Sequence, residues 1–288
     1  MEVIDLRDQE LIAIPEWVFD HPEVKKLLLS NNRLTSLPFR LRELTQLQLL
    51  DVADNFLNDI PTGLSPELRI LKLSNNILFN TPDISTYFQL QQLYLNGNLI
   101  TSLPPELGSL NQLTILRVDD NLLTSLPPEL GNLSQLQQVW IGDNWLTSLP
   151  PEIWCLRSLE ILFAGCNYIS QLPSDINKLT HLTHLDMSGN QLRSIPVELF
   201  KLKYLSYVYM CDNAITTLPS EIGNSVNLHE LFLLHNKLTT LPNDICKLIH
   251  LEKCFYYDNP IINLDPNVEE FLHRVNTRMN KPVYSTSA

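Results

Sequence analysis

The sequence predicts an α/β solenoid, in which about twelve short parallel strands form one sheet and a helix closes the C-terminal end. Three observations predict this fold. An asparagine recurs along most of the chain at a nearly constant interval, and a leucine-rich alternating pair precedes it. A Leu-Pro step follows most copies of the asparagine, and after the last copy the pattern changes to that of an amphipathic helix.

The recurring asparagine sets the register of the units. Adjacent copies are 23 residues apart, except for intervals of 21 and 22 residues between Asn55 and Asn98. Gln9 occupies the same register one unit before the first asparagine. A representative unit is LRVDDNLLTSLPPELGNLSQL, residues 116–136. The asparagines are Asn32, Asn55, Asn76, Asn98, Asn121, Asn144, Asn167, Asn190, Asn213, Asn236 and Asn259.

Each position of the unit has a physical reason. The Leu-x-Leu segment alternates with a period of two, so it predicts a short strand with both leucines inside the coil. The asparagine follows where the chain turns off the strand, and its amide can satisfy buried backbone groups as one step of a ladder. The Leu-Pro step predicts an extended return, and the segment after it predicts a short helical or irregular turn.

The repeated unit resembles the leucine-rich repeat family over residues 1 to about 264. Its 23-residue Leu-Pro form is similar to intracellular arrays, namely Ras-associated signalling scaffolds and bacterial effector proteins. The resemblance implies a right-handed superhelix, shaped as an arc or horseshoe, that binds another protein on its concave face. The pattern departs locally at Thr81, which precedes Pro82, and at Asp265.

The chain is predicted to divide into a repeat array over 1–264, a C-terminal capping helix over 265–280 and a flexible tail over 281–288. The Asp265-Pro266 step predicts the helix start, and the residues of its apolar face are Val268, Phe271, Leu272 and Val275. A secretion or docking signal in the tail is the weaker alternative to simple fraying. Charges within residues 2–8 could protect the first strand edge, or the chain could be cut from a longer protein.

The candidate binding site consists of outward-facing residues that the core does not require. One set stands between the two strand leucines: Tyr94, Arg117, Trp140, Phe163, Asp186, Tyr209, Phe232 and Phe255. Neighbouring outward positions add Tyr207 and Tyr257, and the rim after the asparagine adds Trp145 and Tyr168. A contiguous apolar surface is typical of a binding site, and Trp and Tyr are common interface anchors. The alternative is that these side chains only stack on one another and stiffen the sheet.

Two polar members of this surface have alternative roles. Arg117 could stack on its aromatic neighbours or reach a carboxylate of the partner. Asp186 interrupts the aromatic column and could select a basic group. A separate acidic row directly precedes the recurring residue, for which turn chemistry is the favoured explanation and a negatively charged rim the alternative. That row is Asp8, Asp54, Asp120, Asp143, Asp212 and Asp258.

Composition indicates which classes of partner and which cellular compartment to expect. The net charge of −12 argues against nucleic acid and against an anionic membrane surface as partners. The five scattered cysteines favour a reducing compartment. We therefore expect a cytoplasmic monomer or, for a bacterial protein, delivery into a host cell.

No catalytic constellation is found in the sequence, so no enzyme activity, cofactor or metal is predicted. Cys166 and Cys211 approach the concave face with His184 between them, but about 10 Å separates strands two apart, which is too far for a disulfide or a shared metal. The favoured function is a non-catalytic protein-interaction module acting as a scaffold, adaptor or host-directed effector. The alternative is the recognition part of a larger kinase, GTPase or ubiquitin ligase whose catalytic domain lies outside this chain.

Overall fold

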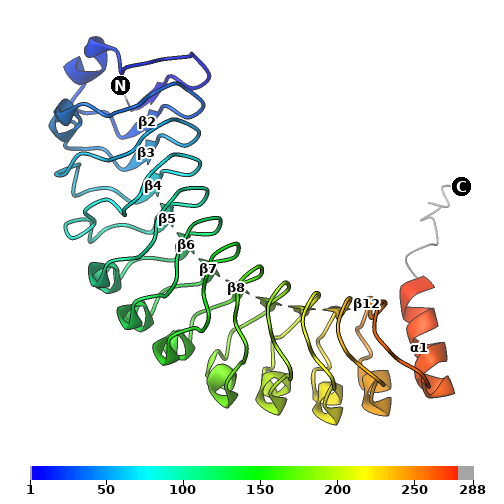
Figure 1. The fold of residues 1–288 in the computed structure, drawn as a ribbon. Helices are drawn as coiled ribbons and strands as arrows, with labels where there is room; N and C mark the ends of the chain where they lie inside the picture. The colour runs from blue at the N-terminus through cyan, green and yellow to red at the C-terminus, as the bar shows by residue number, and fades with distance from the viewer. Residues whose placement is uncertain (1, 278–288) are drawn as a thin grey trace, which may run out of the picture. The chain divides into compact units, whose positions relative to one another are not determined.

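The computed structural model describes residues 2–277. The coils group into two compact units, residues 1–159 and residues 160–288, and each is described by itself. In both units every coil carries a strand on one side and returns on the opposite side, mostly through a short 3-10 helix (Figure 1). The predicted α/β solenoid of parallel strands is confirmed.

The first unit contains strands of three residues that pair in parallel and in chain order. The middle residue of each strand is buried, and most flanking residues are partly or fully exposed. Identical positions of successive strands therefore form rows, such as Tyr94, Arg117 and Trp140. The strands are β1 (Val3–Asp5), β2 (Lys26–Leu28), β3 (Leu49–Asp51), β4 (Ile70–Lys72), β5 (Gln92–Tyr94), β6 (Ile115–Arg117) and β7 (Gln138–Trp140).

The second unit repeats this arrangement. Its strands also pair in parallel and in order, so that Tyr209 lies beside Phe232 and Phe232 beside Phe255. The strands are β8 (Ile161–Phe163), β9 (His184–Asp186), β10 (Tyr207–Tyr209), β11 (Glu230–Phe232) and β12 (Lys253–Phe255). We call the exposed side of these strands the strand face.

Short 3-10 helices form the return of most coils. The first unit has η1 (Glu16–Asp20), η2 (Phe39–Glu43), η3 (Pro105–Ser109), η4 (Pro128–Asn132) and η5 (Pro151–Cys155). The second has η6 (Ser174–Lys178), η7 (Val197–Lys201), η8 (Ser220–Asn224) and η9 (Asn243–Lys247). Each begins after a proline in extended conformation, for example Pro127 at φ −69° and ψ 139°, as the Leu-Pro step predicts. The return segments between β3 and β5 contain no such helix, and they belong to the units of 21 and 22 residues.

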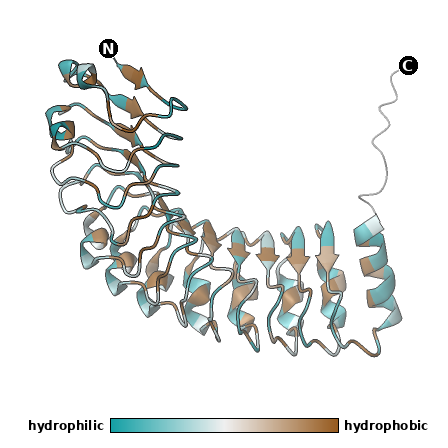
Figure 2. Ribbon diagram, turned by 45° about the horizontal axis from the view of Figure 1, so that its top comes forward, coloured by the Kyte–Doolittle hydropathy of each residue, from teal (hydrophilic) through white to brown (hydrophobic). Residues whose placement is uncertain are grey.

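Adjacent coils approach closely at these turns. A Cβ atom added to Gly131 would lie 2.6 Å from the carbonyl oxygen of Glu152 in the next coil. Glycine is required at this position because the neighbouring backbone occupies the space of a side chain. Hydrophobic segments repeat from coil to coil at the strands and at the helical turns (Figure 2). Because the coils stack closely, their buried leucines form a continuous core within each unit.

The recurring asparagines form the predicted ladder. The Asn144 side chain is 5% exposed and bridges two coils: its Oδ1 accepts from the Leu123 N–H at 2.9 Å. Its Nδ2 donates to the Val118 carbonyl at 3.0 Å and the Gly142 carbonyl at 2.9 Å. Gln9 differs, because it is exposed and only its backbone N–H joins the ladder, through Asn32 Oδ1. The first coil therefore lacks the side-chain amide that the recurring asparagine supplies in the other coils.

The residue before each asparagine adopts a left-handed backbone conformation. Positive φ angles are found at this position in every coil of the described chain, including +50° at Asp143, +52° at Cys166 and +51° at His235. Asp and Asn tolerate this conformation better than most residues. Turn chemistry is thereby confirmed as a reason for the acidic row.

Helix α1 (Pro266–Thr277) covers the last coil, as predicted. It begins one residue later than expected because Asp265 is its cap, accepting from the Asn267 N–H at 2.8 Å. Val268, Leu272 and Val275 are buried. Phe271 was expected on this buried face but is only half-buried, at its margin. The end of the predicted helix and the predicted tail, residues 278–288, lie outside the described residues.

The helix also satisfies the open edge of the last strand. The Asn276 side chain accepts from the Cys254 N–H at 3.0 Å and donates to the Cys254 carbonyl at 2.9 Å. A side chain thus supplies the hydrogen bonds that a further strand would have made. Within residues 2–277 no helix is both long and apolar enough to cross a bilayer.

Candidate functional site

The predicted site residues lie mostly on the strand face. Six of them, together with Asp186 and Arg117, hold the last position of strands β5 to β12, and Tyr207 holds the first position of β10. Tyr257 follows β12 by two residues and is 53% exposed. Trp145 and Tyr168 instead lie after the recurring asparagine, on the flank of their units, and are 56% and 46% exposed.

An aromatic cluster forms on the strand face of the second unit. The ring centroids of Tyr209 and Phe232 are 4.9 Å apart, those of Phe232 and Phe255 4.8 Å, and those of Phe255 and Tyr257 6.2 Å. We call these four residues the aromatic cluster. Because the core is filled from the middle strand position, the fold does not require apolar side chains here. The separations suit offset or tilted aromatic pairs, so the cluster is both self-supporting and open to a partner.

A polar group borders the aromatic cluster at the first strand position. Glu230 accepts from the Tyr209 hydroxyl at 2.7 Å and from Lys253 Nζ at 2.7 Å, and its side chain is only 14% exposed. Beside it, the His184 ring stacks on Tyr207 with centroids 4.2 Å apart. Sequence reasoning identified both tyrosines but did not assign Glu230, Lys253 or the stacked His184. Their signal was a shared register, because all three hold the first outward position of their strands.

Burial and hydrogen bonding shift the pKa values of this polar group. Burial alone would raise the pKa of Glu230, but the hydrogen bonds from Lys253 and Tyr209 together hold it below its ordinary value. Burial, and then the bond to Glu230, raise the pKa of Tyr209. Burial lowers the pKa of His184, opposed by the nearby Glu230 carboxylate. At neutral pH the border of the cluster therefore consists of a carboxylate, an ammonium group, a phenol and a neutral imidazole.

The strand face of the first unit is more cationic. The Arg117 guanidinium lies 4.4 Å from the centroid of the Trp140 ring and forms an ion pair with Asp119 at 3.0 Å. The predicted stacking of Arg117 on an aromatic neighbour is confirmed. Lys72 Nζ lies 5.8 Å from the centroid of the Tyr94 ring. These contacts hold the cations against the rings, and each cation–π contact at a partly exposed site contributes about 0.5–1 kcal/mol.

The flank of the first unit carries an apolar ridge, which we define as Phe56, Ile77, Leu122 and Trp145. Their side chains are 55%, 42%, 39% and 56% exposed, respectively. All of them directly follow the recurring asparagine. Of these four, only Trp145 was among the predicted site residues, although the same register position identifies the other three.

The remaining reactive side chains include cysteines and carboxylates outside the aromatic cluster. No group of three or more His, Cys, Asp or Glu side chains within the described residues is placed to hold a metal ion. Cys254 is fully buried, and burial raises the pKa of its thiol to about 12. Asp186, a predicted contact for a basic group, accepts from the Ser188 N–H at 2.8 Å.

Sequence comparison identifies the family of this fold. A leucine-rich repeat model matches residues 180–238 and a second leucine-rich repeat model matches residues 89–110. Together with the repeating coils, these matches show that the chain is a leucine-rich repeat protein. These two matches do not show whether the repeats are of the 23-residue intracellular subtype, so that assignment stays a prediction.

Curated relatives match only parts of the chain. Mouse podocan is 35% identical over 86 residues, which are 28% of this chain and 14% of podocan. A probable inactive serine/threonine-protein kinase of Dictyostelium discoideum, roco10, is 32% identical over 108 residues, 35% of this chain and 4% of that protein. The chain thus spans a small fraction of these relatives, and the matched regions carry the repeat rather than a whole-protein activity.

Solved structures share the fold over most of the chain. A leucine-rich repeat protein of Leptospira interrogans superposes with a TM-score of 0.78 and 29% identity, covering 93% of this chain and 74% of that one. An internalin of Listeria monocytogenes gives a TM-score of 0.85 at 18% identity, covering 96% and 78%, which shows the fold alone. The plant peptide hormone receptor RGFR1 gives 0.73 at 26% identity, covering 92% and 48%.

Proposed function

We propose that this protein is a non-catalytic module that binds another protein through the strand face of its second unit. The observation that carries the proposal is the aromatic cluster, whose four rings are contiguous and whose last member is 53% exposed. Contiguous apolar surface on a folded domain is typical of an interaction site, and aromatic anchors commonly dominate the binding free energy.

Known proteins of this fold support protein binding as the general activity. RGFR1 is a peptide hormone receptor solved in complex with RGF2, and the leucine-rich repeat part of FLRT2 was solved in a complex with Latrophilin 3 and Unc5D. For this chain we propose the role of a scaffold, adaptor or effector that acts as a monomer. We also propose a cytoplasmic location, which its five free cysteines support.

The chemistry of the cluster defines the partner surface. The four rings form three successive pairs with centroid distances below 6.3 Å, so a partner would meet a continuous apolar strip rather than isolated rings. Along one side of the strip Glu230 and Lys253 neutralise each other at 2.7 Å. We therefore expect an apolar or aromatic segment of the partner to lie along the strip, with polar groups only at its border.

The test is a double substitution in the centre of the cluster, Phe232→Ser with Phe255→Ser. Both rings are outside the core, so the far-UV circular dichroism spectrum should match that of the wild type. Loss of a true anchor costs about 2 kcal/mol or more, roughly a thirtyfold loss in affinity. Chemical crosslinking in lysate followed by mass spectrometry should identify a partner that is crosslinked to the wild-type protein near this face. The purified partner should then bind the variant at least about thirtyfold more weakly than it binds the wild type.

A matched control replaces two exposed apolar residues elsewhere in the second unit, Val226→Ser with Ile249→Ser, which are 45% and 69% exposed. The control should bind the purified partner as the wild type does. The proposal is wrong if the cluster variant folds and retains full affinity, or if the control loses affinity to the same extent.

A further inference from the structure

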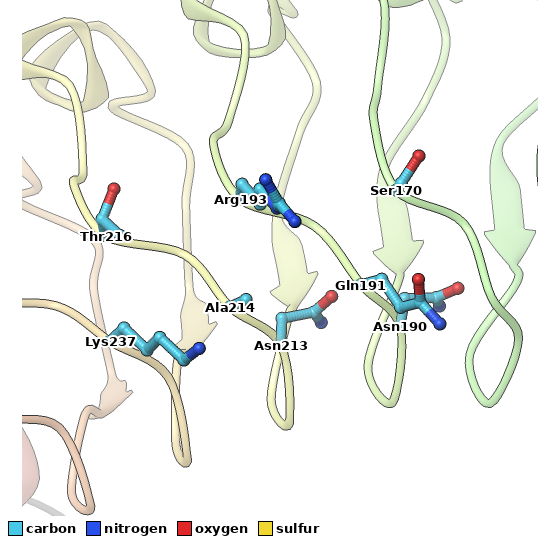
Figure 3. A pocket seen from close by; sticks show the side chains of 8 residues that line it. All are labelled: Ser170, Asn190, Gln191, Arg193, Asn213, Ala214, Thr216 and Lys237. Carbon is cyan, nitrogen blue, oxygen red and sulfur yellow. The ribbon is translucent and has the colours of Figure 1, made fainter.

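We propose that the flank of the second unit is a second binding site, a groove that takes an acidic peptide segment of a partner protein. The groove has a volume of about 870 Å³ and is distinct from the aromatic cluster. It is lined by Ser170, Asn190, Gln191, Arg193, Asn213, Ala214, Thr216 and Lys237 (Figure 3).

The hollow arises because one register position changes character along the chain. Directly after the recurring asparagine, the first unit carries the large side chains of the apolar ridge. In the second unit Tyr168 still holds this position in the first coil, and the next three coils hold Gln191, then Ala214, then Lys237. The methyl group of Ala214 leaves open the space that a large side chain fills elsewhere, so the flank is recessed between its neighbours.

Two cations border the recess. Arg193 and Lys237 are exposed, and neither forms an ion pair with any carboxylate of the described chain. Arg193 also departs from the pattern, because this position holds threonine in most other coils: Thr35, Thr101, Thr124, Thr147, Thr216 and Thr239. The chain has a net charge of −12, yet these two unpaired cations border the same small recess. We therefore expect carboxylates of a partner to pair with them.

Backbone hydrogen bonds between coils fix the main chain that carries these side chains. The Ala214 N–H donates to the Leu192 carbonyl at 2.8 Å, and the Lys237 N–H donates to the Ile215 carbonyl at 2.9 Å. The Thr216 N–H donates to the Arg193 carbonyl at 3.3 Å. Because successive coils are joined by backbone hydrogen bonds, the two cations are carried by a rigid base and lose little backbone entropy on binding.

The length of the groove favours a peptide over a small anion. Arg193 and Lys237 belong to coils two apart, which corresponds to about 10 Å at the spacing of parallel strands. A peptide in the polyproline II conformation advances about 3.1 Å per residue with three residues per turn, so acidic side chains three residues apart lie on one face and match this separation. The exposed Gln191 amide, in the same coil as Arg193, can both donate to and accept from a peptide backbone.

The negative charge of the rest of the surface affects how an acidic peptide can bind. The net charge repels an acidic peptide at long range, so binding must come from contacts inside the groove rather than from general attraction. Arg69 and Lys203, two exposed cations outside the groove, provide a control with the same change in net charge.

The experiment measures fluorescence anisotropy of a labelled, Gly/Ser-rich peptide with two glutamates about three residues apart, and of the same peptide with glutamines instead. We expect the glutamate peptide to bind the wild type at least about tenfold more tightly than the glutamine peptide. Arg193→Glu with Lys237→Glu should weaken that binding at least about tenfold, whereas Arg69→Glu with Lys203→Glu should change it by less than about threefold. Ala214→Trp fills the recess without altering charge and should also weaken binding.

Equal losses in the groove variant and in the control would show nonspecific electrostatics and overturn the proposal, as would equal binding of the two peptides or no binding of either. Unchanged binding by Ala214→Trp would contradict the role of the recess. The cluster variant Phe232→Ser with Phe255→Ser should bind the peptide normally. Normal peptide binding by this variant would show that the groove and the aromatic cluster act independently. Either proposal can then fail while the other holds.

Discussion

At the scale of single residues, the side-chain amide of the recurring asparagine connects each coil to the one before it. Asn144 makes hydrogen bonds to backbone groups of its own coil and of the preceding coil, all of them at a site that is 5% exposed. Water cannot replace these bonds without opening the coil. The ladder therefore fixes both the turn after each strand and the stacking of neighbouring coils.

We expect Asn144→Ala to lower the free energy of unfolding by about 1–3 kcal/mol for each backbone group left unsatisfied. Gln9→Ala, at the same register position, should cost much less because the Gln9 side chain is exposed and makes no hydrogen bond within the described residues. Urea denaturation of both variants measures the difference. Similar losses in the two variants would contradict the role given to the ladder.

Glu230 makes stability depend on pH. Its pKa in the folded chain lies below its ordinary value of 4.5 despite the opposing effect of burial. Between the two pKa values the unfolded chain binds more protons, so stability rises with pH there. The contribution is fully present above the unfolded value and is lost as pH falls through the folded one.

Melting temperatures from pH 3 to pH 7 test this contribution. Glu230→Gln should be less stable than the wild type above about pH 5, and the difference should shrink as the pH falls toward 3. The exposed Glu252→Gln serves as the control and should follow the wild-type curve. A constant difference between Glu230→Gln and the wild type at all pH values would exclude a titrating contribution.

At the scale of elements, α1 ends the solenoid in two ways. Its apolar face covers the last coil with Val268, Leu272 and Val275, which are 0%, 1% and 2% exposed. Its Asn276 side chain completes the hydrogen bonds of β12 at Cys254. The helix thus stands where a further strand would follow β12. It covers a strand edge that could otherwise pair with another chain.

Ending the chain at Leu264 should therefore lower the melting temperature and promote aggregation. Leu272→Ala alone should cost about 2–5 kcal/mol because its side chain is fully enclosed. The exposed Glu270→Ala should be close to neutral. Thermal melts and size-exclusion chromatography measure these effects, and an unchanged melting curve for the truncated chain would refute the capping role.

At the scale of the whole molecule, the charge is strongly unbalanced. The sequence carries 32 acidic and 20 basic residues, and its isoelectric point is about 5.0. At neutral pH the resulting repulsion opposes association of copies of the chain through the exposed rings and the apolar ridge. Near the isoelectric point this repulsion vanishes while the apolar surfaces remain.

We expect static light scattering at low ionic strength to reach a maximum near pH 5 and to fall on either side. Substituting Phe232→Ser with Phe255→Ser should reduce the scattering at the maximum, because part of the attraction comes from the aromatic cluster. The control Val226→Ser with Ile249→Ser should change it less. Scattering that rises steadily from pH 5 to pH 8 would contradict this account.

The sequence alone determined the repeat, its register and most of the local structure. The strands, the extended Leu-Pro return and the asparagine ladder follow from short-range patterns that repeat in most coils, and the capping helix follows from the change of pattern after the last one. The aspartates before the asparagines were assigned to turn chemistry for the same reason, and the left-handed φ angles agree. Even the row of Tyr209, Phe232 and Phe255 could be aligned in advance, because the interval of 23 residues places equivalent positions side by side.

Only the tertiary structure decided which different positions of neighbouring coils meet. The hydrogen bond of Tyr209 to Glu230 joins unlike positions of the repeat, and that of Cys254 to Asn276 joins the last strand to the capping helix. The groove at Ala214 depends on the size of side chains in three successive coils and on the path of the flank between them. A repeat pattern fixes the spacing of the backbone, but side-chain contacts and hollows depend on side-chain rotamers and volumes, which the period of a sequence does not contain.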